Sequence, residues 1–213
     1  IINGSQDVID NWKPYFAIKP NWPKVKLGDV CEINPRTFEP IKEFGNTSCT
    51  YFDISSVENG TGVILQPNAI KCEEAPSRAR RELKLGDVLL STVRPNLKAF
   101  AIITQEYKNM VASTGFAVLR EKEGVSVGKF LLYSIFQEYM IAQMVGCMGK
   151  GAYPSINQTD VENLYIALPP IAEQKAIVDK IEFEEKYINT CKEYIAHYKQ
   201  KIADKIQSVW SSK

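Results

Sequence analysis

Residues 149–182 read G-K-G-A-Y-P-S-I-N-Q-T-D-V-E-N-L-Y-I-A-L-P-P-I-A-E-Q-K-A-I-V-D-K-I-E, and this stretch decides the fold that the sequence predicts. A glycine-rich turn leads through a polar segment to an apolar, strand-like run from Leu164 to Leu168. Pro169 and Pro170 follow, and proline suits a helix start because its missing N–H has no intrahelical partner to lose. From Ile171 to Ser211 there is neither proline nor glycine. We therefore predict one continuous helix, about 60 Å long at about 1.5 Å per residue.

The apolar residues of this helix recur at alternating steps of three and four. A repeat of about 3.5 residues indicates a coiled-coil seam rather than the broader apolar face of a helix in a globular core. Glu184 and Lys205 interrupt the seam, and charged residues of both signs flank it. We expect the seam to pair with another long helix, from a second copy, from a partner subunit or from an N-terminal half absent from this sequence. Its members are Ile177, Ile181, Ile188, Cys191, Ile195, Tyr198, Ile202 and Val209.

The amino-acid composition limits the classes of protein to which the chain can belong. The chain has 213 residues, 45% hydrophobic and 24% charged, which is enough for one sizeable core beside the long helix. A net charge of +1 gives no reason to expect nucleic acid or a membrane as partner. Evidence for such a partner must therefore come from local clusters of charge. The apolar runs are shorter than the roughly 20 residues of a membrane span. Five cysteines without a C-x-x-C pair are typical of reduced thiols in a cytoplasmic protein rather than of disulfides or a metal site.

The chain divides into three predicted parts. Residues 1–21 form a helix end and a proline-containing linker, residues 22–168 a folded domain, and residues 169–213 the long helix. Turn-separated strands indicate an α+β fold with a curled, mostly antiparallel sheet and few helices, followed by one long protruding coiled-coil helix. A hairpin turn is predicted at E-N-G-T-G-V-I, residues 58–64, and a helix at about Val127–Val145. The predicted strands are Val25–Leu27, Val30–Ile33, Thr50–Ile54, Val88–Val93, Ala99–Thr104, Val111–Leu119 and Leu164–Leu168.

Signatures of catalysis are missing from the sequence. It contains no P-loop, no G-x-S-x-G, no H-E-x-x-H and no dinucleotide fingerprint. Residues 168–171, L-P-P-I, differ from the Asn-Pro-Pro-aromatic loop with which amino-methyltransferases hold a flipped base. They lack both the asparagine and the aromatic residue. We therefore predict no catalytic residue, no metal and no cofactor in this chain.

Three loops carry side chains suited to DNA. The segment from Lys71 to Lys98 holds seven basic against four acidic residues, and arginine can pair with phosphate or bidentately with guanine. A solvated loop with surface ion pairs is the alternative. Residues 92–98 form a proline-stiffened turn, and residues 150–158 a glycine-hinged loop whose amides can read adenine. The predicted DNA contacts are Arg36, Arg78, Arg80, Arg81, Lys84, Arg94, Asn96, Lys98, Lys150, Tyr153, Ser155, Asn157 and Gln158.

Four segments together resemble the specificity (S) subunit of type I restriction–modification systems. They are L-G-D-V-C-E-I-N (27–34), L-K-L-G-D-V-L-L-S-T-V-R-P-N-L (83–97), G-A-Y-P-S-I-N-Q-T-D-V-E-N-L (151–164) and L-P-P-I-A-E-Q-K-A-I-V-D-K-I-E (168–182). The resemblance extends from about Trp22 to the end of the chain, and the Leu-Pro-Pro…Glu-Gln-Lys helix start is distinctive for the family.

The resemblance implies a target recognition domain at residues 22–168 and a conserved spacer helix at residues 169–213. This is roughly half of a family member, so we expect a C-terminal half or a single-domain half subunit. Its implied role is sequence-specific reading of one half of a bipartite site in double-stranded DNA. The implied partners are methyltransferase (modification) subunits carrying S-adenosylmethionine and a motor-nuclease (restriction) subunit carrying ATP and magnesium, with no membrane.

Two other interpretations stay open. The same domain could be the recognition region of a fused restriction–methylation enzyme. Alternatively, the chain could be a coiled-coil assembly module without DNA affinity. In the preferred interpretation the helix, about 60 Å long against about 34–36 Å per DNA turn, fixes the gap between two half-sites.

Overall fold

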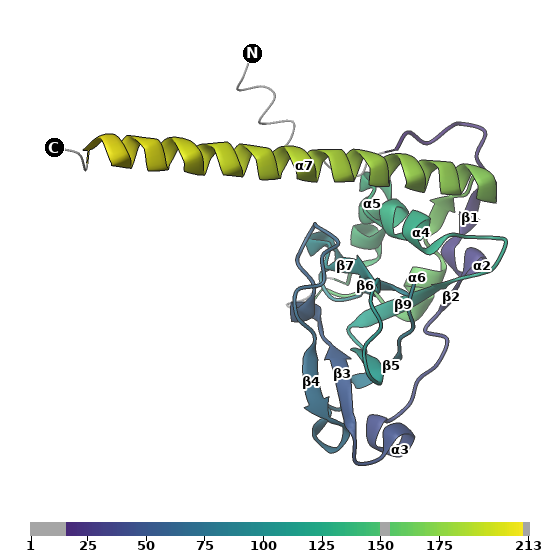
Figure 1. Cartoon of the computed structure of the whole chain (residues 1–213). Coiled ribbons are helices and arrows are strands. Elements are labelled where there is room, and N and C mark those ends of the chain that lie inside the picture. Colours follow the sequence, from purple (N-terminus) through teal and green to yellow (C-terminus); the bar gives the residue numbers. More distant parts are fainter. Residues whose placement is uncertain (1–15, 150–153, 211–213) are drawn as a thin grey trace. The chain divides into compact units, whose positions relative to one another are not determined.

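The computed structural model of the chain, drawn in Figure 1, describes residues 16–149 and 154–210. These residues form two compact units. One is Ala17–Lys175, and the other contains Phe16 and residues 176–210. The helix end predicted within residues 1–12 lies outside the described residues.

Two four-stranded sheets and one two-stranded sheet make up the strand content of the first unit within the described residues. The first sheet has the order β4-β3-β8-β5, with β3 Ser48–Phe52, β4 Asn68–Lys71, β5 Ala79–Glu82 and β8 Met110–Ser113. The second has the order β2-β9-β6-β7, with β2 Cys31–Ile33, β6 Val88–Ser91, β7 Phe100–Ile102 and β9 Phe116–Glu121. The third pairs β1 Lys24–Lys26 with β10 Tyr165–Ala167. Only the β3–β8 pair is parallel among these strands, so the predicted α+β fold with mostly antiparallel pairing is confirmed.

One hydrophobic cluster contains residues of both larger sheets. Phe52 of β3 and Phe116 of β9 are fully buried in one cluster, together with Leu89 of β6. Each such side chain contributes roughly 1.5–3 kcal/mol by leaving water. Successive strand residues face opposite sides, so Tyr51 instead joins a smaller cluster on the other face of β3, against Phe44 of α3 (Pro40–Phe44).

The predicted strand Val111–Leu119 is wrong as a single element. It is divided into β8 and β9, which belong to different sheets. The chain turns between them at Gly115, where an added Cβ would lie 3.0 Å from Ile54 Cδ1. Glycine therefore allows this close approach at the corner, and a purely apolar pattern gives no sign of it.

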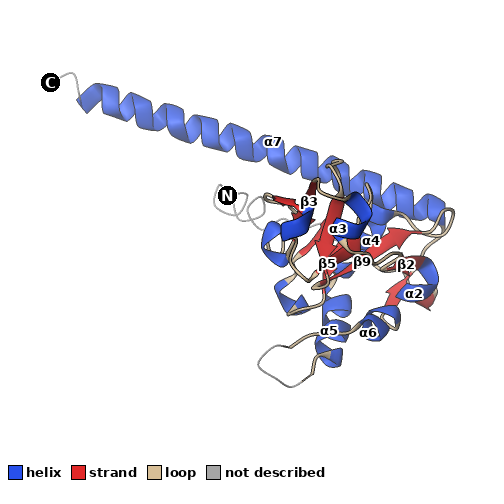
Figure 2. Cartoon of the chain, turned by 90° about the horizontal axis from the view of Figure 1, so that it is seen from below, coloured by secondary structure: helices blue, strands red, loops and turns tan. Residues whose placement is uncertain are grey.

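The single helix predicted at Val127–Val145 is also two elements, α4 (Gly128–Ile135) and α5 (Glu138–Cys147). Gln137 adopts an extended conformation at the break, and its buried amide donates to Tyr133 O. Helix α4 lies against β6, β7 and β9, and Figure 2 shows α4 and α5 as separate short helices. Leu27–Val30, predicted to end one strand and begin the next, instead forms the short helix α2.

The long helix is confirmed as α7, Ile171–Trp210, with 40 residues. Its first turn is fixed to the first unit through Glu173 and Gln174. Gln174 is fully buried; its Oε1 accepts the Val127 N–H at 3.0 Å, and its Nε2 donates to Val125 O and Pro169 O. Glu173 pairs with Lys19 and accepts from the Trp22 indole at 3.2 Å. These contacts give a structural role to the Glu-Gln pair of the Leu-Pro-Pro…Glu-Gln-Lys helix start.

The predicted seam is not uniformly exposed. Ile181 has only 2% of its surface exposed and is already buried within the chain, whereas Tyr198 and Ile202 are 57% and 61% exposed. Ile177, Ile188, Cys191 and Ile195 are half-buried, and the side chain of Val209 is not described. Among the described seam residues, Tyr198 and Ile202 are thus the most exposed. No helix in the described ranges has the length and apolarity needed to cross a bilayer.

Candidate nucleic-acid interface

Backbone hydrogen bonds join the second and third predicted loops. Ile156 N–H donates to Thr92 O at 2.9 Å, and Arg94 N–H donates to Pro154 O at 2.9 Å. Both pairs cross between segments that are more than fifty positions apart in the sequence. The structure therefore makes one surface from two loops that the sequence presents separately.

The first predicted loop meets the same surface at Arg78. Thr114 N–H donates to Arg78 O, and Thr92 N–H donates to Gly115 O, each at 2.8 Å. The corner at Thr114–Gly115 thus connects Arg78 to the strand end that leads to Arg94. We call residues 78, 92–98, 114–115 and 154–158 the loop junction. The Arg78 and Arg94 side chains are both exposed there, and Arg78 has no side-chain partner within the described part of the chain.

Other basic residues predicted to contact DNA are engaged in ion pairs. Arg36 binds Glu43 with both terminal nitrogens, at 2.7 and 2.8 Å, and also approaches Glu82 at 3.3 Å. Arg80 pairs with Glu39 at 3.0 Å. These contacts fit the solvated-loop alternative for this part of the basic segment. DNA contact by Arg36 and Arg80 stays a prediction.

Two further members of the basic segment lie beside these pairs. Lys84 approaches Glu82 at 3.8 Å. Arg81 donates to Thr37 Oγ1 at 3.0 Å, and burial lowers the pKa of its guanidinium. Its Nε is buried without a hydrogen-bond partner among the described residues. Arg81 therefore does not offer its full set of donors to a ligand, whereas Lys84 is 63% exposed and makes only a long surface pair.

A buried ion pair that the sequence analysis missed connects the two sheets. Arg120 of β9 binds Asp87 through Nε and Nη2 at 2.8 and 2.7 Å, and Glu82 of β5 through Nη1 at 3.1 Å. The Asp87 side chain is 1% exposed and also accepts the Lys84 N–H at 2.7 Å. Gly86, with φ of 87°, makes the turn that allows this. The L-G-D motif therefore has a structural role here.

Burial acts to raise the pKa of Glu82, but the hydrogen bonds from Arg120 and Arg36 outweigh it and lower the pKa. Glu82 is thus held ionised between two arginines. Because Glu82 belongs to one sheet and Arg120 to the other, this charge arrangement links the two sheets.

Two predicted base-reading amides have structural partners. Asn157 Oδ1 accepts the Asp160 N–H at 2.9 Å, and the Asp160 carboxylate accepts the Asn157 N–H at 2.8 Å. This reciprocal cap begins α6, Gln158–Glu162, a helix that the sequence analysis missed although Asn-x-x-Asp is a helix-start signal. Gln158 Oε1 accepts from Asn34, and its Nε2 donates to Glu162.

The remaining predicted contacts differ in their surroundings. Lys98 donates to the Glu138 carboxylate at 3.0 Å. Asn96 and Ser155 are exposed on the loop junction. Lys150 and Tyr153 lie outside the described residues. Arg78, Arg94, Asn96 and Ser155 are therefore predicted contacts that are exposed on the junction.

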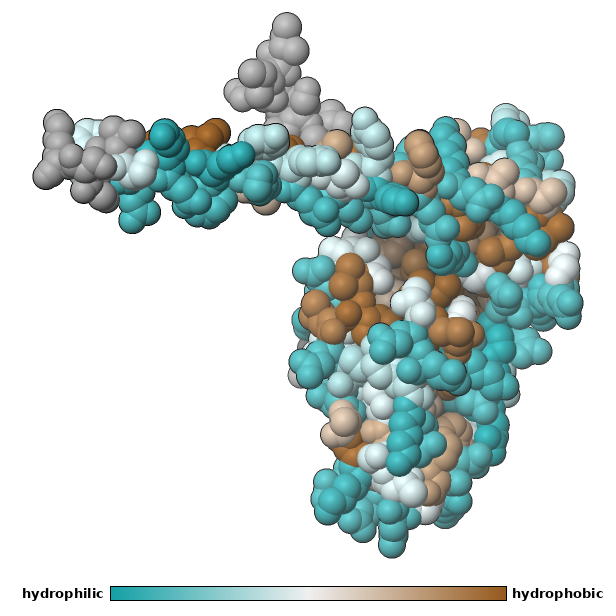
Figure 3. Space-filling model, viewed as in Figure 1, coloured by the Kyte–Doolittle hydropathy of each residue, from teal (hydrophilic) through white to brown (hydrophobic). Residues whose placement is uncertain are grey.

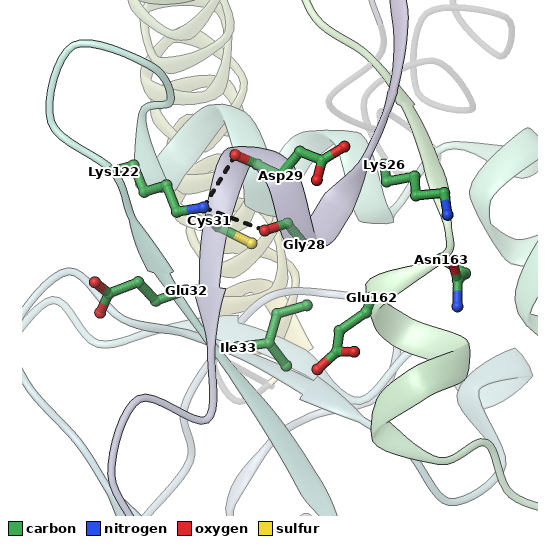
Figure 4. Close-up of a pocket in the computed structure, with 9 residues that line it drawn as sticks. All are labelled: Lys26, Gly28, Asp29, Cys31, Glu32, Ile33, Lys122, Glu162 and Asn163. Carbon is green, nitrogen blue, oxygen red and sulfur yellow. Dashed lines mark hydrogen bonds between the residues drawn. The ribbon is translucent and has the colours of Figure 1, made fainter.

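A cavity of about 370 Å³ lies beside α2, β2 and α6 (Figure 4). Lys122 Nζ donates there to the carbonyls of Gly28 and Asp29, at 3.2 and 3.0 Å. Burial raises the pKa of the Cys31 thiol to about 12, so this thiol is neutral and is not an activated nucleophile. Its lining residues are Lys26, Gly28, Asp29, Cys31, Glu32, Ile33, Lys122, Glu162 and Asn163. Across the described ranges no cluster of three His, Cys, Asp or Glu side chains is placed to hold a metal ion.

Comparison with known proteins identifies the class to which this fold belongs. The family model described as "Type I restriction modification DNA specificity domain" matches residues 19–204, so the chain belongs to that family. The resemblance found in the sequence is confirmed.

Individual relatives carry the same description. The chain is 26% identical over 170 residues to the type I restriction enzyme HindI specificity subunit of Haemophilus influenzae, covering 76% of this chain and 34% of that protein. It is 21% identical over 193 residues to the EcoDI specificity subunit of Escherichia coli, covering 91% and 41%. The chain thus spans less than half the length of these relatives.

Solved structures agree in fold. The crystal structure of the HsdS subunit from Thermoanaerobacter tengcongensis matches with a TM-score of 0.74 and 32% identity, over 85% of this chain and 46% of that one. A structure described as the basis of complex assembly and conformational transition of the type I R-M system matches with a TM-score of 0.73 and 32% identity, over 86% and 47%.

Proposed function

We propose that this chain reads one half of a bipartite site in double-stranded DNA as part of a type I restriction–modification complex. The observation that supports the proposal is the loop junction, where three segments distant in the sequence converge. Two exposed arginines, Arg78 and Arg94, lie on backbones joined through the Thr114–Gly115 corner. Arginine pairs with phosphate or with guanine, and the family is defined by DNA specificity.

The long helix supports the second half of the proposal. Its exposed seam residues, Tyr198 and Ile202, would lose unfavourable contact with water by packing against another long helix. We assign that position to a second copy of the chain or to a helix from the other half of a longer subunit. Inserting seven residues after Tyr194 should then change the half-site spacing that the complex prefers.

Partner subunits complete the assembly in this proposal. Methyltransferase subunits carrying S-adenosylmethionine and a motor-nuclease subunit carrying ATP and magnesium would supply the chemistry. This chain would supply only recognition.

A salt-dependence measurement tests the DNA contact. The chain, with and without its methyltransferase partner, is titrated against a randomised duplex pool at several salt concentrations. We expect Arg78→Ala combined with Arg94→Ala to weaken binding and to reduce the logarithmic salt slope by about 1–2, because each phosphate contact contributes about 0.9. Lys108→Ala is the matched control, since this exposed cation precedes β8 at the end opposite Thr114. Wild-type protein that fails to bind duplex in either state contradicts the proposed function and favours an assembly module.

A further inference from the structure

The turn after Val93 is held in an unusual backbone conformation. Residues Pro95–Leu97 form the short 3₁₀ helix η3. Arg94 before it (φ 48°, ψ 55°) and Lys98 after it (φ 58°, ψ 40°) are both left-handed. Side chains other than glycine are strained in this region, and such strain persists only where the surroundings impose it.

Contacts at both ends impose this conformation. Arg94 N–H donates to Pro154 O and Gly60 N–H donates to Lys98 O, each at 2.9 Å. Lys98 Nζ donates to Glu138 of α5 at 3.0 Å. The turn is therefore fixed before any ligand arrives, and the Lys98 charge is used within the protein.

Asn96 and Leu97 are the residues that this fixed turn exposes. Asn96 is exposed, and its amide has no hydrogen-bond partner in the described part of the protein. Leu97 is 46% exposed, although most large apolar residues of this unit are buried. Figure 3 shows several separate hydrophobic areas on the face of this unit that is in view. An unpaired amide beside an exposed aliphatic side chain, on a rigid support, offers two complementary groups to a ligand.

We propose that this turn reads an A·T-containing base-pair step in the major groove. Asn96 bonds the N6 and N7 edge of adenine, and Leu97 contacts a thymine methyl in the same or the adjacent pair. The Asn96 amide matches adenine because adenine presents one donor and one acceptor, whereas guanine presents two acceptors. The Leu97 side chain matches thymine because thymine carries a methyl group that cytosine lacks. Lys98 and Glu138 are positioning residues. The inference rests on the proposed function, since it names the bases that the loop junction reads.

The test uses the chain assembled with its methyltransferase partner. Preferred sites are selected from a randomised duplex pool for wild type, Asn96→Ala, Leu97→Ala, Glu138→Ala and the control Lys108→Ala, each checked for folding by thermal melting. We expect Asn96→Ala to lose about 5- to 150-fold discrimination for adenine at one position. Glu138→Ala should lower the same discrimination without changing the salt slope, and Lys108→Ala should keep the wild-type preference.

The thymine contact has its own chemical probe. Replacing the selected thymine by deoxyuridine removes only the methyl group, so it should weaken wild-type binding and leave Leu97→Ala unaffected. Wild-type base preferences in both Asn96→Ala and Leu97→Ala would overturn the inference. So would a Leu97→Ala protein that keeps its preference but loses the methyltransferase, because the exposed leucine would then be a protein-docking residue. A wild-type protein without any base preference would overturn the proposed function itself.

Discussion

Removing Arg120 should strongly destabilise the first unit. In Arg120→Leu the Asp87 carboxylate, whose side chain is 1% exposed, keeps the Lys84 N–H as its one partner among the described residues. Two hydrogen bonds to Asp87 and one to Glu82 are lost together. Breaking a buried pair by removing one partner costs about 3–5 kcal/mol, because the other charge remains buried without compensation.

Urea unfolding measures this free energy directly. Thermal melting should show a fall of about 6–20 °C, at about 2–4 °C per kcal/mol for a unit of this size. Combining Arg120→Leu with Asp87→Asn should recover part of the loss, because the uncompensated charge is then gone. Lys84→Ala is the control, since its exposed side chain contributes only a surface pair. A loss under about 1 kcal/mol for Arg120→Leu, or no recovery in the double variant, would refute the assignment of a buried ion pair between the sheets.

Three further predictions follow from single side chains. Gln174→Ala should cost about 1–3 kcal/mol of unfolding free energy in urea, because it leaves the Val127 N–H without its acceptor; Lys175→Ala should be near neutral. Asn157→Ala should cost about 0.5–2 kcal/mol by removing the α6 cap, while Asn157→Asp should preserve stability, and equal losses would contradict a capping role. The lowered pKa of Glu82 means that its contribution is present above the unfolded pKa of about 4.3 and is lost as pH falls through the folded pKa. Glu82→Gln should therefore reduce the loss of unfolding free energy below about pH 5. If Glu82→Gln loses as much stability on acidification as the control Glu58→Gln, the prediction is wrong.

The positions of proline and glycine predicted the elements whose ends depend on neighbouring residues in the sequence. The helix α7 begins at Ile171 because Pro169 and Pro170 end the preceding strand, and it continues because no proline or glycine interrupts it. The interpretation of these elements as a recognition domain and a spacer helix came from the family resemblance, because the residue pattern alone does not show it.

Non-local contacts set the limits of the prediction. The pairing of Arg36 with Glu82 joins residues far apart in the chain, so the sequence could show a basic segment but not which cations are neutralised. The corner at Gly115 separates two strands that share one apolar pattern, because their neighbours lie in different sheets. The cap at Asn157 is different. Its signal, Asn-x-x-Asp, was present in the sequence and was interpreted as base reading instead.

Photo-crosslinking from the loop junction tests whether these loops contact DNA in the assembled complex. A photoreactive benzoylphenylalanine replaces Ser155, which is exposed on the junction, or Glu106, an exposed residue outside it. The assembled complex is then irradiated with its selected duplex. We expect protein–DNA crosslinks from position 155 and none from position 106. Crosslinking from position 106 with none from position 155 would show that DNA binds elsewhere on the chain.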